Sequence, residues 1–102
     1  MAGNQVKYTA SAYEDLDRIT DYLIERNPEA AWDTYVRLTE AAKRLREFPS
    51  MGPMMNDPDL RAYGYRRLIV DDYSMIYQVF DGLIVIYHIF NHRQDYAGVF
   101  AK

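Results

Sequence analysis

The segment 63–96 constrains the fold most, because it reads as three consecutive β-strands separated by two short breaks. Asp71-Asp72 separates the first apolar run from the second, and Asp81-Gly82 separates the second from the third. Asp-Gly between two apolar runs is a strong hairpin signal, because the primed turns that suit hairpins require positive φ. The runs are rich in Ile, Val, Tyr and Phe, which favour strands. The sequence therefore predicts an antiparallel meander.

A two-residue loop at Asp81-Gly82 would fix the register of the second hairpin. The expected pairs are Phe80 with Leu83, Gln78 with Val85, Ile76 with Tyr87, and Ser74 with Ile89. The opposite face would carry Tyr73, Met75, Tyr77, Val79, Ile84, Ile86, His88 and Phe90. Both faces are largely apolar, whereas a sheet with one solvated face alternates apolar and polar side chains. Both faces of this sheet are therefore expected to be covered.

A strand and a helix are predicted near the N-terminus. Residues 5–9 form a short strand candidate that would add a fourth strand to the meander. Apolar residues then recur at helical spacing through 12–26. Ser11 and Glu14 fit a capping box, in which the hydroxyl accepts from an unpaired amide and the carboxylate reaches back. The first helix is therefore expected to begin just after Ser11.

A second helix is predicted to follow at once. Asn27 is a favourable N-cap, and Pro28 suits the first helical position. The apolar stripe continues to about Phe48, where Pro49 ends it. So short a connection predicts an antiparallel helix hairpin. Residues 49–62 contain turn signals without periodicity and are predicted to be irregular.

These elements predict one α+β domain over residues 1–102, in the order β-α-α-β-β-β, with an antiparallel sheet packed on the helix hairpin. The hairpin can cover one sheet face, and neither the irregular link nor the tail 97–102 is expected to cover the other. We therefore expect a partner or a second copy to bind there, at Ile76, Phe80, Val85 and Tyr87. Alternatively, the apolar content reflects strand propensity, and the aromatic side chains stay partly exposed.

Composition narrows the range of functions. The 102 residues include no cysteine, which excludes disulfides and thiolate metal sites. The sequence shows no signal peptide and no apolar run of membrane-spanning length, so a soluble cytoplasmic protein is expected. Residues 1–62 contain 11 acidic and 8 basic side chains, and the remainder contains 4 of each. A nucleic-acid contact would therefore need a local basic cluster.

Polar residues gather around the predicted meander. The candidate catalytic residues are Arg66, Arg67, His92, Arg93 and Tyr96. Arginine offers a fork of donors for phosphate, histidine can transfer protons near neutral pH, and tyrosine can stack on a base. Together they could handle phosphate. Alternatively, the adjacent arginines point to opposite faces, so that one is solvated, and Arg93 forms a surface pair with Asp95.

The remaining polar residues are expected to be structural. His88 lies within an apolar run and is expected to be a hydrogen-bonded sheet residue, and Trp32 is expected to serve packing. The chain has two histidines without a flanking ligand pattern and no glycine-rich phosphate loop. We therefore expect neither a metal site nor a cofactor.

The order of these motifs resembles the RelE/ParE superfamily of bacterial type II toxins over nearly the whole chain. The resemblance rests on the helix hairpin, the link PSMG, and the runs LRAYGYRRL and YSMIYQVFDGLIVIYHIFNHRQDY. Its most specific parts are the arginine pair, the Tyr73–Tyr77 spacing and the closing His-x-x-Asp. The resemblance implies a toxin neutralised by a cognate antitoxin, with growth inhibition and plasmid stabilisation as its effects, and a homodimer as a further option.

Within the superfamily, the link PSMG followed by GYRR looks more like the ParE branch, whose members act on DNA gyrase and do not cleave RNA. RNA-cleaving members usually carry an arginine directly after the first tyrosine of the third strand, and this chain has Ser74 there. The resemblance therefore favours a ParE-like toxin. A RelE-like ribosome-dependent mRNA endonuclease and a binding module without toxicity remain the alternatives.

The resemblance matches several residues of this chain to places in the active site of the RNA-cleaving members. Arg93 matches the place of a second active-site arginine. Arg66 or Arg67 lies near the place of the catalytic lysines, and Tyr96 or Phe100 lies near that of a C-terminal catalytic tyrosine. The endonuclease alternative thus has named residues to test.

Overall fold

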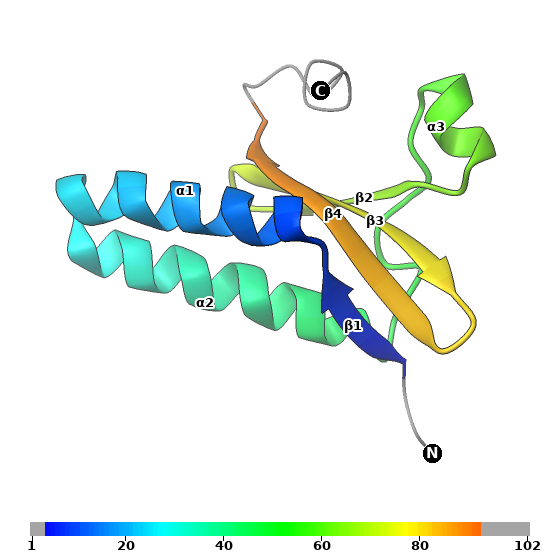
Figure 1. Ribbon diagram of the computed structural model, residues 1–102, viewed down its shortest axis with the longest axis horizontal. Coiled ribbons are helices and arrows are strands. Elements are labelled where there is room, and N and C mark those ends of the chain that lie inside the picture. Colours follow the sequence, from blue (N-terminus) through cyan, green and yellow to red (C-terminus); the bar gives the residue numbers. More distant parts are fainter. Residues whose placement is uncertain (1–3, 93–102) are drawn as a thin grey trace.

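The computed structural model describes residues 4–92, in which two long helices pack against one face of a four-stranded sheet (Figure 1). The elements in chain order are β1 (Gln5–Tyr8), α1 (Ala10–Arg26), α2 (Pro28–Arg44), α3 (Pro58–Ala62), β2 (Arg66–Val70), β3 (Tyr73–Phe80) and β4 (Leu83–Asn91). The predicted α+β order is confirmed, with α3 as an addition. None of the helices in this range is long and apolar enough to cross a membrane.

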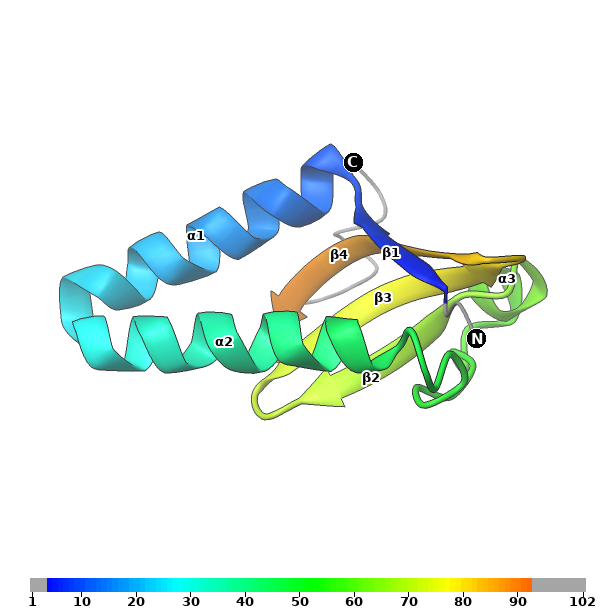
Figure 2. The ribbon, with the colours of Figure 1, turned by 90° about the horizontal axis from the view of Figure 1, so that it is seen from below.

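The four strands lie in the spatial order β1-β4-β3-β2. β2, β3 and β4 form the predicted antiparallel meander, and β1 pairs in parallel with β4. Figure 2 shows α1 and α2 running side by side across one side of this sheet, joined by a tight turn. The predicted fourth strand and helix hairpin are both confirmed, but the parallel pairing of β1 makes the sheet mixed and not antiparallel throughout. Within residues 4–92, β1 and β2 are the edge strands.

The register of the β3–β4 hairpin changes halfway along. Phe80 pairs with Leu83, and Gln78 pairs with Val85, as predicted. A β-bulge then inserts Tyr87 as an extra residue, so that Ile76 lies opposite His88 and Ser74 lies opposite Phe90. The predicted pairs Ile76–Tyr87 and Ser74–Ile89 are therefore wrong.

The turn between β3 and β4 is a two-residue loop, as predicted, but it is not a primed turn. Gly82 has a φ of 73°, whereas Asp81 is not in the positive-φ region. Primed turns require positive φ at the first central residue. The loop before β3 instead holds Asp71 at a φ of 54°, a conformation that aspartate tolerates better than most residues.

Side-chain caps fix where the long helices begin. The Thr9 hydroxyl accepts from the Ala12 amide at 3.1 Å, so α1 starts at Ala10 and the predicted Ser11 cap is wrong. Asn27 caps α2 as predicted, because its side chain accepts from the Ala30 amide at 3.2 Å. α2 ends at Arg44, and a turn over residues 45–47 replaces its predicted last turn.

The segment predicted to be irregular contains the short helix α3. Asp57 is its N-cap, and its carboxylate accepts from the amides of Asp59 and Leu60 at 3.0 and 3.2 Å. Pro58 occupies the first helical position, where its missing amide costs nothing. The Asx-Pro pattern that began α2 therefore also begins α3.

Two apolar clusters lie on opposite faces of the sheet. The larger one joins the helices to the sheet and includes Leu16, Leu38, Leu45, Met75, Tyr77, Ile84 and Ile86. The smaller one consists of Met55, Ile76 and Phe90, with Leu60 and Tyr65 packed against it. The expectation that nothing in the chain covers the second face is therefore wrong at its middle, where Ile76 is 0% exposed. Phe80, at the end of β3, is 46% exposed.

Candidate functional site

A chain of hydrogen bonds joins three polar residues on the sheet face opposite the two long helices. Arg67 Nε donates to Ser74 Oγ at 2.9 Å, and Ser74 Oγ lies 3.0 Å from His92 Nδ1. His92 Nε2 lies 2.9 Å from the carbonyl oxygen of Asp71. The structure therefore brings together Arg67 and His92, two of the predicted site residues, through Ser74.

The chemistry of the partners fixes the direction of this chain. The Asp71 carbonyl can only accept, so His92 Nε2 carries a hydrogen. In the neutral imidazole, Nδ1 is then an acceptor, and the Ser74 hydroxyl donates its hydrogen to it. The remaining lone pair on Ser74 Oγ accepts from Arg67. Both ring nitrogens of His92 and the hydroxyl of Ser74 are thus engaged within the protein.

His92 is held at three points although its side chain is exposed. Besides its two ring contacts, its backbone amide donates to the Asp72 carbonyl at 2.9 Å. Ser74, the central member of the chain, is 0% exposed. Arg93 and Tyr96, the other two predicted residues beyond β4, lie outside the described residues.

Arg66 is not part of this chain of hydrogen bonds and instead binds the segment that connects α2 to α3. Its Nη1 donates to the Gly52 carbonyl at 2.9 Å, close to the buried Tyr77 hydroxyl. Burial raises the pKa of Tyr77, while the Gly52 hydrogen bond and the Arg66 guanidinium oppose that rise. The two adjacent arginines therefore lie on opposite faces, as the alternative predicted, but neither is simply solvated, because each donates a hydrogen bond within the protein.

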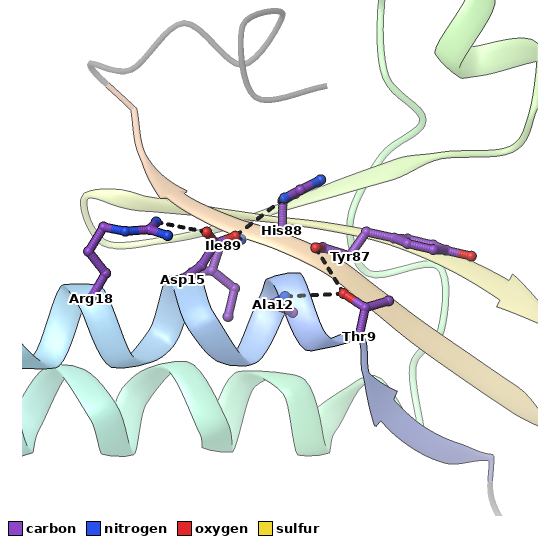
Figure 3. A network of polar contacts seen from close by, with 7 residues as sticks. All are labelled: Thr9, Ala12, Asp15, Arg18, Tyr87, His88 and Ile89. Atoms are coloured by element: carbon purple, nitrogen blue, oxygen red, sulfur yellow. Dashed lines mark hydrogen bonds and ion pairs between the residues drawn. The ribbon is translucent and has the colours of Figure 1, made fainter. Parts of the chain in front are cut away.

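A second polar network, which the sequence reasoning missed, fastens α1 to β4 (Figure 3). Asp15 Oδ2 accepts from the Ile89 amide at 3.0 Å and lies 3.3 Å from His88 Nδ1. Arg18 Nη1 pairs with the other carboxylate oxygen at 2.9 Å. Beside it, the Thr9 hydroxyl donates to the Tyr87 carbonyl at 3.2 Å. His88 is thus a hydrogen-bonded sheet residue, as expected.

Asp15 therefore binds a backbone amide at the edge of β4, beyond the point where the pairing with β1 ends. Its buried position could have been found from the sequence, because it follows Ala12 by three residues and so lies on the apolar side of the helix. A carboxylate at such a position needs partners to offset its desolvation. The strand amide and the neighbouring cation supply them here.

The predicted partner-binding residues have different environments. Ile76 is buried within the protein, whereas Val85 and Tyr87 are partly exposed and Phe80 is exposed. The Tyr87 hydroxyl donates to Gln78 Oε1 at 2.6 Å, and the Tyr87 ring makes an edge contact with Tyr65. Burial is the main cause that raises the pKa of Tyr87, and the neighbouring Tyr65 raises it further.

Known proteins resemble this chain in sequence and in structure. Residues 6–96 match the family described as the ParE toxin of the type II toxin-antitoxin system, parDE. Toxin RelE2 of Caulobacter vibrioides is 36% identical over 85 residues, which cover 83% of this chain and 91% of that protein. A structure of the chromosomal ParDE system from P. aeruginosa aligns with a TM-score of 0.72 and 26% identity, over 86% of this chain and 95% of that chain.

The RelBE2 toxin-antitoxin complex of Mycobacterium tuberculosis shares the fold, with a TM-score of 0.64 and 19% identity over 92% of this chain and 97% of that chain. The fold and these matches define a type II toxin of the RelE/ParE superfamily, which confirms the resemblance seen in the sequence. Within it, the chain belongs to the ParE toxin family.

Proposed function

We propose that this toxin is a ParE-like growth inhibitor that acts on DNA gyrase in the cytoplasm and is neutralised by a cognate antitoxin. Its family supports the role of a toxin. The preference for gyrase over the ribosome is carried by one observation, the buried and fully hydrogen-bonded Ser74 between Arg67 and His92.

Ser74 occupies the place where RNA-cleaving relatives usually carry an arginine. A serine there brings no cation to a phosphate, and its hydroxyl is already bonded on both sides. Losing a charge-assisted donor to the transition state costs about 10²–10³ in rate. The engaged ring nitrogens of His92 likewise argue against proton transfer to a bound RNA from this arrangement.

A RelE-like mRNA endonuclease is the second candidate. It is favoured by the 36% identity to a protein named Toxin RelE2, which extends over 83% of this chain. Arg93 and Tyr96 would be its candidate catalytic residues, together with Arg67.

The antitoxin partner is supported by the relatives, because one structural neighbour is a toxin-antitoxin complex and the other belongs to a ParDE system. The protein also exposes large apolar side chains, including Phe80 on the sheet and Trp32 on the helix hairpin, where Trp32 is 66% exposed. Exposed apolar patches often mark interaction sites. A homodimer through one of these surfaces is a second option.

Two parallel assays test the target. The purified protein is incubated with DNA gyrase and relaxed plasmid, and separately with translating ribosomes and mRNA. We expect loss of supercoiling in the first assay, with no codon-specific cleavage in the second. Cleavage at rates comparable to an active RelE-type toxin, with gyrase unaffected, would overturn the gyrase proposal and establish the endonuclease.

A further inference from the structure

A groove of about 530 Å³ lies between β1 and the two long helices. Figure 2 shows β1 at the edge of the sheet, beside the first turns of α1 and the last turns of α2. Val6, Leu16 and Ala42 contribute apolar surface to the groove, and β1, α1 and α2 each contribute a tyrosine. Small-molecule sites in proteins usually enclose about 300–1,000 Å³. The groove is therefore large enough for a small organic ligand.

The tyrosines give this groove accessible aromatic surface. The rings of Tyr8 and Tyr13 stack with their centroids 5.1 Å apart, and Tyr13 remains 57% exposed. Tyr35 stacks on Trp32 and is 39% exposed. Burial, together with the neighbouring tyrosines, raises the pKa of Tyr8 to about 12, so that its hydroxyl stays neutral at physiological pH. A flat aromatic ligand can therefore stack on the exposed rings of Tyr13 and Tyr35 without meeting a negative charge.

Among the described residues, the charged side chains that line the groove are all cationic: Lys7, Lys43 and Arg46. Lys43 pairs with the exposed Glu40 at 3.4 Å, and Arg46 Nε donates to the Asn4 carbonyl at 3.2 Å. An ammonium has three donors and a guanidinium has five, so these contacts use only part of their capacity. The whole chain has a formal net charge of −3, so this concentration of cations does not follow from composition. The groove is therefore complementary to an anion.

The backbone of β1 adds a third kind of contact. The amides of Gln5 and Thr9 donate to carbonyls of the β3–β4 loop and of β4, both at 3.0 Å, so alternate residues of β1 face β4. The amide and carbonyl groups of Val6 and Tyr8 consequently point away from the sheet. No hydrogen bond joins these groups to any other residue in the range 4–92. The edge of the groove therefore offers both donors and acceptors to a ligand.

We propose that the groove beside β1 binds a free nucleotide, with its base stacked on the exposed tyrosine rings and its phosphates on the cationic side chains. Phosphate oxygens accept strong, charge-assisted hydrogen bonds from lysine and arginine. The edge of a base carries both donors and acceptors, and it pairs with the outward backbone groups of Val6 or Tyr8. This inference goes beyond the toxin function and depends on neither gyrase nor the ribosome as the target.

Two related ligands fit the groove less well. Inorganic phosphate would contact the cations but would leave the tyrosine rings and the outward groups of β1 without a partner. A single-stranded nucleic acid is normally bound in a basic groove that follows several phosphates, on the order of 4–16 nucleotides. Here the cations are gathered in one groove of about 530 Å³. A free nucleotide uses the aromatic, cationic and backbone groups together.

Matched ligands test each part of the proposal by calorimetry. The purified protein is titrated at about 0.15 M salt with ADP, GDP, adenosine, pyrophosphate and a single-stranded DNA of about ten nucleotides. We expect ADP, GDP or both to bind with a Kd below about 1 mM, and about tenfold more tightly than adenosine or pyrophosphate. The proposal would be overturned by no binding of either nucleotide up to about 1 mM, or by equally tight binding of adenosine or of pyrophosphate. Tighter binding of the DNA than of both nucleotides would overturn it in favour of a nucleic-acid surface.

Charge removal locates the phosphates with a matched control. The double variant Lys7→Gln/Lys43→Gln is compared with Arg44→Gln/Arg61→Gln, which makes the same change in net charge outside the groove. The folding of each variant is checked by urea unfolding. We expect the groove variant to raise the Kd of the nucleotide by about tenfold, and the control to change it by less than about threefold. Equal changes in the two variants would overturn the proposed site.

The stacking contact has a control on the same helix. Tyr13 and Tyr22 both lie on α1 with similar exposure, 57% and 56%, but only Tyr13 lines the groove. We expect Tyr13→Leu to raise the Kd of the nucleotide by about fivefold or more and Tyr22→Leu to leave it nearly unchanged. In the wild-type protein, the NMR signals of the Val6 and Tyr8 amides should shift when ADP or GDP is added. A bound nucleotide that shifts neither amide, with equal Kd values for the two tyrosine variants, would overturn the proposed site.

Discussion

The buried hydroxyl of Tyr77 accepts a hydrogen bond from the backbone amide of Gly52 at 2.9 Å and fastens the link after α2 to the centre of the sheet. The same hydroxyl donates to the Pro49 carbonyl at 2.8 Å. The PSMG link and the Tyr73–Tyr77 spacing, two separate parts of the family resemblance, are therefore in direct contact. The Tyr77 side chain thus fixes the position of the segment that leads from α2 toward β2.

Replacing Tyr77→Phe should destabilise the protein, because it leaves the Gly52 amide and the Pro49 carbonyl without this partner. We expect a loss of about 1–3 kcal/mol in the free energy of unfolding, measured by urea denaturation. Tyr87→Phe is the control, because among the described residues its hydroxyl bonds only to the side chain of Gln78, in a partly exposed position. An equal loss in the two variants would show that the contact with the link has no special role.

Gly52→Ala tests the close approach of the same link to β2. A Cβ at Gly52 would lie 2.8 Å from the Arg67 carbonyl oxygen and 2.9 Å from its carbon, so backbone must move. We expect a loss of about 1–3 kcal/mol in the free energy of unfolding. The exposed neighbour Ser50→Ala should stay within about 0.5 kcal/mol of the wild type in the same urea titration. A Gly52→Ala variant as stable as Ser50→Ala would mean that the link can shift freely.

The stability of the protein should fall at alkaline pH because of Tyr8. Its folded pKa of about 12 lies above the ordinary value of 10.0. Between these values the unfolded chain loses a proton that the folded protein keeps, so the free energy of unfolding decreases as pH rises through this window. Urea titrations from pH 8 to about pH 11 should show a smaller decrease for Tyr8→Phe than for the wild type. The same slope in both proteins would assign the loss to other tyrosines.

The elements of the fold could be predicted from periodicity and turn residues, but the register of β4 beyond Val85 could not. The bulge at Tyr87 exchanges the faces of the residues that follow it. In a strand with polar residues on one face, this change of phase would appear in the sequence pattern. Here the exchanged residues include Ile89 and Phe90, which are both apolar, so the pattern stays the same.

The candidate site was predictable in part. Sequence order placed Arg67 and His92 at neighbouring strand ends, and the structure joins them. The role of Ser74 as the link between them was not predictable, because it depends on the register after the bulge. The cover over Ile76 was missed for a different reason. It comes from Met55 and Leu60, whose contacts with the sheet are not encoded by any local pattern.

Arg93→Ala should reduce growth inhibition while leaving the fold intact. Arg93 directly follows His92, which three hydrogen bonds hold in place, and an arginine there can bind an anionic group of the target. The unfolding midpoints of the variant and the wild type are first compared to show that the variant folds. Each protein is then expressed in bacterial cells without antitoxin, and the growth rates are compared. Full toxicity of a folded Arg93→Ala variant would favour the alternative in which Arg93 only forms a surface pair with Asp95.

Aspartate substitutions at Ile76 and Phe80 separate folding from partner binding on the second sheet face. Ile76 is 0% exposed, so Ile76→Asp buries an unpaired charge and should lower the free energy of unfolding by about 3 kcal/mol or more. Phe80 is 46% exposed, and Phe80→Asp should change the free energy of unfolding by less than about 1 kcal/mol. It should nevertheless weaken antitoxin binding or self-association, measured by calorimetry and by sedimentation at several concentrations. Unchanged association of a folded Phe80→Asp protein would exclude the end of β3 as a contact surface.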